Sequence, residues 1–185
     1  MVECHLAKVD VKGSSPFRRS KYSSGGIRIM KISDFLRKEA VCTDLKSETK
    51  VDVISEMVTM LVDNGIIEKK FKNKIVEGLM AREALGSTAI GQGIAIPHTK
   101  SDTVTDLISA LAISKKGINF DSLDGEPAHI FFLLIAPSDS AGPHLKALAR
   151  VSRLLKDKFF RDSLKNTKTA KDVMDLVHQE DSRIG

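Results

Sequence analysis

The run Ile130-Phe131-Phe132-Leu133-Leu134-Ile135 is apolar at every position and has the length of a β-strand. Continuous apolar runs of about four to eight residues are typical of strands that are covered on both faces. We therefore predict that residues 130–135 form the central strand of a buried sheet. Even with Ala136 added, the run is far shorter than the roughly 20 residues of a membrane-spanning helix, so the sequence predicts no membrane insertion.

Four further segments have strand-like patterns: Val41–Leu45, Thr88–Ile90, Ile94–Ile96 and Leu107–Ser114. The last of these keeps apolar or small side chains on both faces, as a covered strand does. The links at 91–93 and 114–118 are too short for the helix that joins parallel neighbours. At least part of the sheet must therefore be antiparallel.

Apolar residues at three- and four-residue steps predict helices before, between and after the strands. The predicted helices are Asp34–Ala40 behind a Ser33 cap, a helix from a Ser47 or Thr49 cap to Asn64, Glu68–Leu85, Ser140–Lys156, Phe159–Lys165 and Thr169–His178. Such an arrangement implies a sheet that is covered on both sides. The predicted fold is a single α/β domain with a mixed, partly antiparallel β-sheet flanked by helices on both faces.

The positive charge of the chain is concentrated at its N-terminus. Of the net charge of +5 over 185 residues, most comes from residues 1–29, which hold six basic and two acidic side chains. We interpret residues 1–29 as a flexible basic tail or an upstream extension, and residues 30–185 as the domain. Because the domain itself is nearly neutral, its charge does not indicate a nucleic-acid-binding face.

The cysteines and the N-terminus favour a cytoplasmic protein. Cys4 and Cys42 lie far apart, so they predict neither a disulfide framework nor a metal site. The N-terminus lacks the apolar stretch and cleavage site of a secretory signal. No nucleotide-binding loop and no cluster of metal-ligating residues is apparent, so we predict no cofactor and no metal.

The segment Gly91-Gln92-Gly93-Ile94-Ala95-Ile96-Pro97-His98 carries the first candidate functional residue. A small apolar strand runs into Pro97, which cannot extend a hydrogen-bonded ladder, and His98 follows at once. This order places an imidazole on a stiff backbone at the end of a strand. Gly91 and Gly93 permit positive φ or close backbone approach nearby. Taken alone, a histidine at this position is explained more simply by a capping or solvated role.

His144 is the second candidate, in the first turn of the helix predicted at 140–156. It continues an apolar stripe formed by Leu148, Val151 and Leu155. The N-terminus of a helix carries free N–H groups and partial positive charge, which together with an imidazole N–H suit an anion. The alternative is a histidine that only caps the edge of the core.

Arg82, Ser87 and Thr88 complete the candidates. Arg82 lies late in a polar helix, and its planar guanidinium suits a phosphate bound through two oxygens. Ser87 and Thr88 follow at the turn and offer hydroxyl and amide hydrogens. The alternatives are an arginine that faces water and a turn that has only a structural role.

These motifs together resemble the IIA domain of the fructose–mannitol class of the bacterial phosphotransferase system, including its nitrogen-regulatory branch. The resemblance covers residues 30–179 and rests on Arg82-Glu83, Gly86-Ser87-Thr88, the segment from Gly91 to His98, and Pro137 followed by His144-Leu145. It implies that His98 is the phosphorylated histidine, His144 its partner and Arg82 the phosphate-side cation. It also implies a mixed sheet with helices on both sides. Thr99 stands where nitrogen-branch members often have glycine, so the subfamily stays open.

Phosphoryl transfer is chemically suited to this residue set. Imidazole, with an ordinary pKa near 6.5, is a nucleophile that is neutral near pH 7. The transferring group keeps negative charge on its oxygens, so catalysis needs cations and N–H donors around it. We expect His98 to attack, His144 and Arg82 to hold the oxygens, and Ser87, Thr88, Gly91 and Gly93 to support the phosphate.

The leading hypothesis is a phosphoryl carrier that accepts phosphate from the phosphocarrier HPr, or from its nitrogen-branch relative, and passes it to a separate IIB domain in sugar uptake. The alternative is a free-standing nitrogen-type regulator whose phosphorylation state controls its binding to target proteins. A metal hydrolase that uses His98 and His144 is disfavoured, because no carboxylates accompany the two histidines.

Overall fold

The computed structural model describes residues 30–184. The interpretation of residues 1–29 lies outside these residues. In chain order, the elements are a 3-10 turn at Ile32–Asp34, β1 Leu36–Cys42, α1 Lys50–Asp63, a 3-10 turn at Lys69–Phe71, α2 Lys72–Ala84, β2 Ala89–Gly91, β3 Ile94–Ala95, β4 His98–Ser101, β5 Ile108–Ile118, β6 Ala128–Pro137, α3 Ala141–Leu154, α4 Lys158–Lys165 and α5 Ala170–Arg183.

The strands form one mixed sheet, which confirms the predicted fold class. Its order is β1-β5-β6-β3-β2, and β4 also pairs with β6. The β5–β6 and β2–β3 pairs are antiparallel, whereas β1 runs parallel to β5, and β3 and β4 run parallel to β6. The β2–β3 pair follows from the short connection at 91–93, as predicted, whereas β5 and β6 are joined by residues 119–127 and not by the link predicted at 114–118.

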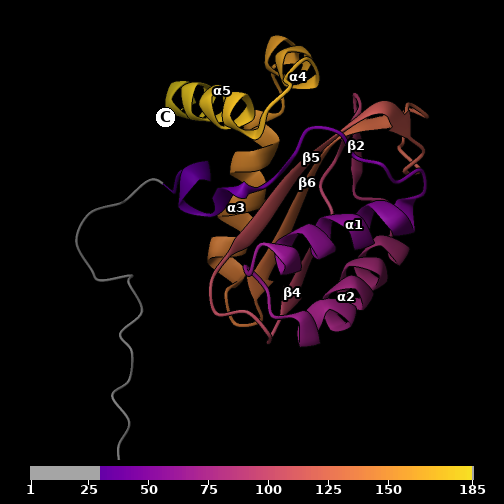
Figure 1. The fold of residues 1–185 in the computed structure, drawn as a ribbon, viewed down its shortest axis with the longest axis vertical. Coiled ribbons are helices and arrows are strands. Elements are labelled where there is room, and N and C mark those ends of the chain that lie inside the picture. Colours follow the sequence, from indigo (N-terminus) through magenta and orange to yellow (C-terminus); the bar gives the residue numbers. More distant parts are fainter. Residues whose placement is uncertain (1–29, 185) are drawn as a thin grey trace, which may run out of the picture.

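Helices cover both faces of the sheet (Figure 1). On one face α1 packs against β1 and β5 while α2 packs against β4; on the other, α3 packs against β6 and α5 against β1. The predicted central run in β6 is fully buried between these layers, with residues 131–135 showing no exposed surface. Among residues 30–184, no helix combines the length and the apolarity needed to cross a membrane.

The strands β3 and β4 lie end to end along the same edge of β6. Ile94 in β3 lies opposite Ile130. His98 in β4 lies opposite Leu134, so both strands keep one register against β6. Between them, the carbonyl of Pro97 accepts a hydrogen bond of 2.9 Å from the Leu134 amide. His98 therefore begins a second short strand, whereas the sequence predicted only that it follows the end of one.

The predicted helix Asp34–Ala40 is wrong. The chain makes a 3-10 turn at Ile32–Asp34 and then forms the edge strand β1, Leu36–Cys42. Leu36 and Ala40 are buried, and the charged residues between them are exposed. Charged side chains are usual on an edge strand, and here they imitate the composition of a helix. Pairing with β5, not local propensity, decides the structure.

Several other predicted bounds also differ from the structure; the helix predicted at 169–178, for example, continues to Arg183 in α5. The helix predicted from Glu68 starts at Lys72, behind the 3-10 turn at 69–71. Only the first two residues of the strand predicted at 41–45 lie in β1. The segment 114–118, predicted as a link, continues β5, with a shift of register between Ile113 and Ile118. At such an irregularity the residues of the two strands no longer pair one to one, and the strand nevertheless continues.

Candidate functional site

The structure brings His98, His144 and Arg82 together. His98 begins β4, Arg82 lies in the last turn of α2, and His144 lies in the first turn of α3. The Nε of Arg82 donates a hydrogen bond of 3.2 Å to Nε2 of His98. The ring centroids of His98 and His144 are 5.6 Å apart, and the rings are inclined by 48°. The strand β4 and one helix from each face of the sheet, α2 and α3, thus meet at this site.

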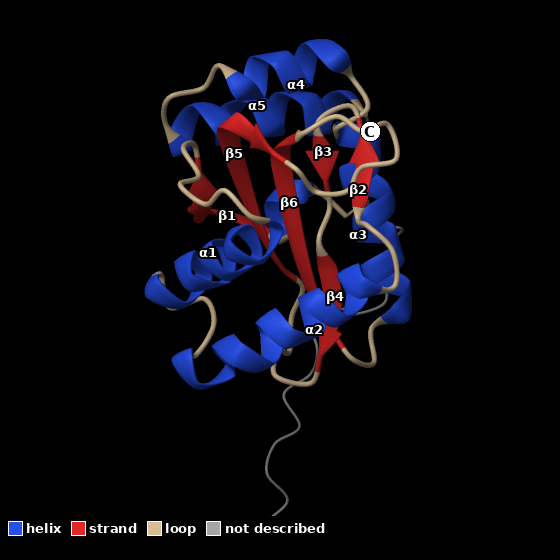
Figure 2. Cartoon of the chain, turned by 90° about the vertical axis from the view of Figure 1, so that its right-hand side faces the viewer, coloured by secondary structure: helices blue, strands red, loops and turns tan. Residues whose placement is uncertain are grey.

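The packing of α2 on β4 explains how Arg82 reaches His98 (Figure 2). A Cβ at Gly78 would lie 3.0 Å from Oγ1 of Thr99, the residue after His98. The absence of a side chain at Gly78 therefore lets the helix lie close to the strand. Arg82, four residues later, projects from the same face of α2. This places its guanidinium beside the His98 ring.

One nitrogen of His98 is bound to the backbone, and the other carries a lone pair that faces Arg82. Nδ1 lies 2.8 Å from the carbonyl of Ile96, which can only accept, so the neutral ring carries its proton there. Nε2 then has the lone pair to which Arg82 donates. Burial lowers the pKa of His98, and the charge of Arg82 lowers it further. The Ile96 carbonyl and Glu83 raise the pKa but do not outweigh these two effects. The site thus favours the neutral imidazole.

His144 is buried, with 6% of its surface exposed. Within residues 30–184, its Nδ1 has no hydrogen-bond partner. An unmet lone pair at the buried Nδ1 is less costly than an unmet N–H, so we infer that the neutral ring carries its proton on Nε2. Burial lowers the pKa of His144, and the neighbouring His98 and Lys100 lower it further. The two histidines thus hold opposite tautomers: one offers a lone pair at Nε2, the other an N–H.

The hydroxyls of Ser87 and Thr88 are engaged in structural hydrogen bonds. Thr88 Oγ1 donates to the carboxylate of Glu83 at 2.6 Å. Ser87 Oγ donates to the carbonyl of Phe120 at 2.5 Å and accepts from the Ala89 amide. Both residues therefore fix the turn between α2 and β2. The structure shows neither hydroxyl free to meet a phosphate.

Gly91 and Gly93 form the turn between β2 and β3, with φ of 87° and 76°. A Cβ at Gly91 would lie 2.8 Å from a carboxylate oxygen of Asp124, which also accepts from the amide of Gln92. Along an extended chain, the distance from Gly93 to His98 is about 16 Å. The structure therefore places both glycines at the far end of the β3–β4 line and not beside the histidines.

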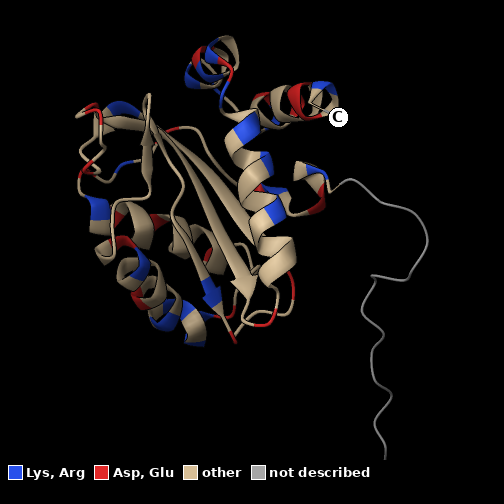
Figure 3. Ribbon diagram, turned by 180° about the vertical axis from the view of Figure 1, so that it is seen from behind, with Lys and Arg blue, Asp and Glu red and all other residues tan. Residues whose placement is uncertain are grey.

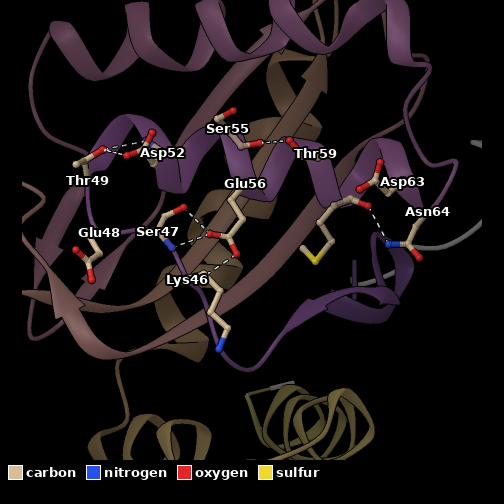
Figure 4. A pocket seen from close by; sticks show the side chains of 11 residues that line it. Lys46, Ser47, Glu48, Thr49, Asp52, Ser55, Glu56, Thr59, Asp63 and Asn64 are labelled. Carbon is tan, nitrogen blue, oxygen red and sulfur yellow. Dashed lines mark hydrogen bonds between the residues drawn. The ribbon is translucent and has the colours of Figure 1, made fainter.

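A groove of about 870 Å³ runs along the outer face of α1 (Figure 4). It is lined by residues of the preceding loop and of the helix, and it includes none of the candidate residues. Glu56 within it accepts hydrogen bonds from the amides of Lys46 and Ser47. We assign these contacts to anchoring the β1–α1 loop. Among residues 30–184, no group of three or more His, Cys, Asp and Glu side chains could hold a metal ion.

The protein is thus an α/β domain with a mixed sheet, and its candidate functional site consists of two neighbouring imidazoles and a guanidinium. Residues 34–180 match the family described as "Phosphoenolpyruvate-dependent sugar phosphotransferase system, EIIA 2". The chain therefore belongs to the EIIA 2 family, whose members are components of the phosphotransferase system. This confirms the resemblance that the motifs around His98 indicate.

Two relatives belong to different branches. The chain is 38% identical over 152 residues to the fructose-specific EIIABC component of the phosphotransferase system of Bacillus subtilis, covering 82% of this chain and 24% of that protein. It thus spans about a quarter of the length of that relative. It is 33% identical over 148 residues to a nitrogen regulatory protein of Bradyrhizobium diazoefficiens, covering 80% of this chain and 95% of the relative.

Solved structures share the fold. Nitrogen regulatory protein IIA-Ntr of Neisseria meningitidis superposes with a TM-score of 0.72 at 29% identity, covering 79% of this chain and 98% of that one. The IIA mannitol enzyme of Escherichia coli, solved in complex with phosphorylated IIB, gives 0.66 at 22% identity, covering 78% and 97%. At that identity the second similarity shows the fold alone.

The lowered histidine pKa values predict that the protein loses stability in mild acid. The unfolded chain binds protons at these histidines as the pH falls below about 6.5, before the folded chain does, so the free energy of unfolding decreases. Urea denaturation between about pH 7.5 and about pH 5 measures this loss. Replacing both His98 and His144 with glutamine should weaken the pH dependence. An unchanged dependence would contradict the burial of two neutral imidazoles.

Proposed function

We propose that this protein is a phosphoryl carrier that accepts a phosphoryl group on Nε2 of His98 from the phosphohistidine of an HPr-type phosphocarrier. It passes that group to a separate IIB domain. The observation that carries the proposal is the state of His98: its Nδ1 proton is bound to the Ile96 carbonyl, and its Nε2 lone pair faces the guanidinium of Arg82. This is the arrangement of an oriented nucleophile beside a cation.

The two histidine rings and Arg82 account for the electron pairs and the charges in the transfer step. The Nε2 lone pair forms the bond to phosphorus while the nitrogen–phosphorus bond of the donor breaks, and the donor nitrogen keeps that electron pair. The His98 ring gains positive charge, which the Ile96 carbonyl stabilises at Nδ1. Arg82 loses its acceptor at Nε2 and can donate to the phosphoryl oxygens. The Nε2–H of His144 supplies a further donor.

The proposed partners follow from this chemistry and from the relatives. The donor is a phosphohistidine protein, and the IIB acceptor agrees with the complex solved for the mannitol enzyme. No cofactor is required, because transfer between histidines involves no nucleotide. The reaction would take place in the cytoplasm, where phosphoenolpyruvate feeds the phosphocarrier.

A regulatory role is the second candidate, and the relatives named nitrogen regulatory proteins favour it. Phosphorylation adds a charge of about −1.5 to −2 at His98, beside Arg82. A target protein that binds this surface would distinguish the two states by that charge. The carrier and the regulator would therefore use the same phosphorylated histidine. They differ in the partner, which is a IIB domain for the carrier and a target protein for the regulator.

Reconstitution with purified phosphoenolpyruvate, the first enzyme of the system and HPr tests the proposal. We expect the intact mass to increase by one phosphoryl group and peptide mapping to place that group on His98. Adding a purified IIB domain should then move the group to IIB. Phosphorylation without onward transfer would favour the regulator, and absence of phosphorylation would overturn both.

Arg82→Lys should slow phosphoryl transfer by about ten- to a hundredfold, although the positive charge is kept. Lysine lacks the planar fork that can stay anchored on the Gly86 carbonyl while it donates to the phosphoryl oxygens. Quenched-flow measurement of the transfer rate from phosphorylated HPr gives the comparison. Arg153→Lys, at an exposed position of α3, is the matched control and should react at the wild-type rate. A wild-type rate for Arg82→Lys would remove the guanidinium from the mechanism.

A further inference from the structure

Glu83 is a buried carboxylate that the proposed reaction does not use. It lies in the last turn of α2, next to Arg82, with 5% of its surface exposed. The C-terminal end of a helix carries partial negative charge, and burial adds a desolvation cost, so both features oppose an anion there. The pKa of Glu83 is nevertheless lowered, because hydrogen bonds from Lys50 and Thr88 outweigh its burial. An ionised group at such a position needs a specific reason.

Both oxygens of the Glu83 carboxylate have well-defined partners. Oε1 accepts from Nζ of Lys50 at 2.8 Å. Oε2 accepts from the backbone amide of Thr88 at 2.9 Å and from its hydroxyl at 2.6 Å. Lys50 also pairs with Asp121 at 2.7 Å and lies over the ring of Phe120. The carboxylate thus ties the end of α2 to the start of β2 and to the N-terminus of α1.

A continuous path of hydrogen bonds leads from Glu83 to His98. The amide of Thr88 binds Glu83, and the carbonyl of Thr88 accepts from the amide of Ile96 at 3.0 Å. The carbonyl of Ile96 in turn holds Nδ1 of His98 at 2.8 Å. The position of that carbonyl decides which nitrogen of the neutral ring carries the proton. Glu83 is therefore connected to the His98 ring through two backbone residues.

The same carboxylate fixes the turn that anchors Arg82. The two hydrogen bonds that Thr88 donates to Glu83 close residues 83–88 into a short loop. Within it, Gly86 has a φ of 147°, and its carbonyl accepts from Nη1 of Arg82 at 3.0 Å. The guanidinium is thus held by the Gly86 carbonyl as well as by His98. Both sides of the Arg82–His98 contact are linked to one acidic side chain.

We propose that Glu83, held by Lys50, is the positioning residue of the site: it fixes the Nδ1–H tautomer of His98 and the orientation of Arg82 by closing the 83–88 turn onto β3. The inference deepens the proposed phosphoryl transfer, and it rests on that function for its kinetic effect. Its effect on the tautomer is independent of any phosphate donor.

Glu83→Gln tests the inference, because it keeps the size of the side chain and removes its charge. We expect phosphoryl transfer from phosphorylated HPr to slow by about ten- to a hundredfold. Nitrogen-15 NMR of the ring should show a single Nδ1–H tautomer of His98 in the wild-type protein and a mixture in the variant. Glu77→Gln, at an exposed position of the same helix, is the matched control and should change neither measurement.

Thr88→Val is the second variant and carries the test if Glu83→Gln does not fold. It removes one hydroxyl bond to Glu83 and keeps the amide bond, so we expect the same changes at smaller amplitude, about three- to tenfold in rate. A folded Glu83→Gln protein with the wild-type tautomer and the wild-type transfer rate would overturn the inference. This holds even if its melting temperature is lowered, because Glu83 would then stabilise the fold without positioning the site. If wild-type His98 takes up no phosphate, the proposed function fails, while the tautomer comparison still decides the role of Glu83.

Discussion

His98→Ala abolishes the incorporation of phosphate from phosphorylated HPr. No other described side chain combines an Nε2 lone pair with a hydrogen bond from Arg82. Removing the nucleophile leaves the guanidinium and His144 with no atom to which phosphorus can bond. The loss should be complete within the sensitivity of the assay, and the fold should persist, because the half-buried ring contributes one backbone hydrogen bond of about 1 kcal/mol.

Intact-mass analysis after incubation with the phosphorylated carrier measures the effect. The phosphate on the wild-type protein should be labile in acid and stable in base, as expected for a nitrogen–phosphorus bond. His178→Ala is the matched control, because His178 is exposed on α5 and outside the site. Full incorporation into the His98→Ala protein would place the reactive residue elsewhere and refute the assignment.

The centre of the fold could be predicted from the sequence because burial on both faces leaves a direct pattern. The run 130–135 and the segment 107–114 are apolar whichever way each side chain points, and they form β6 and β5. The edge strand β1 gave no such pattern. Its exposed charges at 37–39 suit a helix as well, and only pairing with β5, about 70 residues later, selects the strand.

The convergence of His98, His144 and Arg82 could be predicted only from the resemblance to a family. Each residue alone has an ordinary structural explanation, and spacing along the chain does not show that β4 and α3 meet. The motif also suggested phosphate contacts for the Gly91 turn, whereas the structure occupies it with Asp124. Glu83 was missed because its partner Lys50 lies 33 residues away. The available signal was an acidic residue in the last turn of a helix, where charge is disfavoured.

His144→Gln should slow phosphoryl transfer by about ten- to a thousandfold and leave the fold intact. The expected size is that of removing one oriented donor from a developing anion. Nδ1 of His144 is buried without a partner, so we infer that the ring carries its proton on Nε2 and donates it to an oxygen of the phosphoryl group. The ring centroids of His98 and His144 are 5.6 Å apart, so a phosphoryl group on His98 would lie beside the His144 ring.

The pH dependence of this variant distinguishes a donor from a packing residue. A phosphoryl group on His98 carries negative charge toward His144, and this charge raises the pKa of His144 and favours its protonated, doubly donating form. In the wild-type protein the charged His144 should therefore counter the acid lability of the nitrogen–phosphorus bond, a gain in protection that grows as the pH falls toward about 6. In His144→Gln that gain should disappear, because glutamine does not titrate.

Stopped transfer reactions followed by mass analysis give both the rate and the hydrolysis profile. His178→Gln serves as the control for a histidine removed from an exposed helix, and both of its profiles should match the wild type. If His144→Gln keeps the wild-type rate and the wild-type hydrolysis profile, then the imidazole at the start of α3 fills space at the edge of the core. In that case Arg82 alone must neutralise the transferred group.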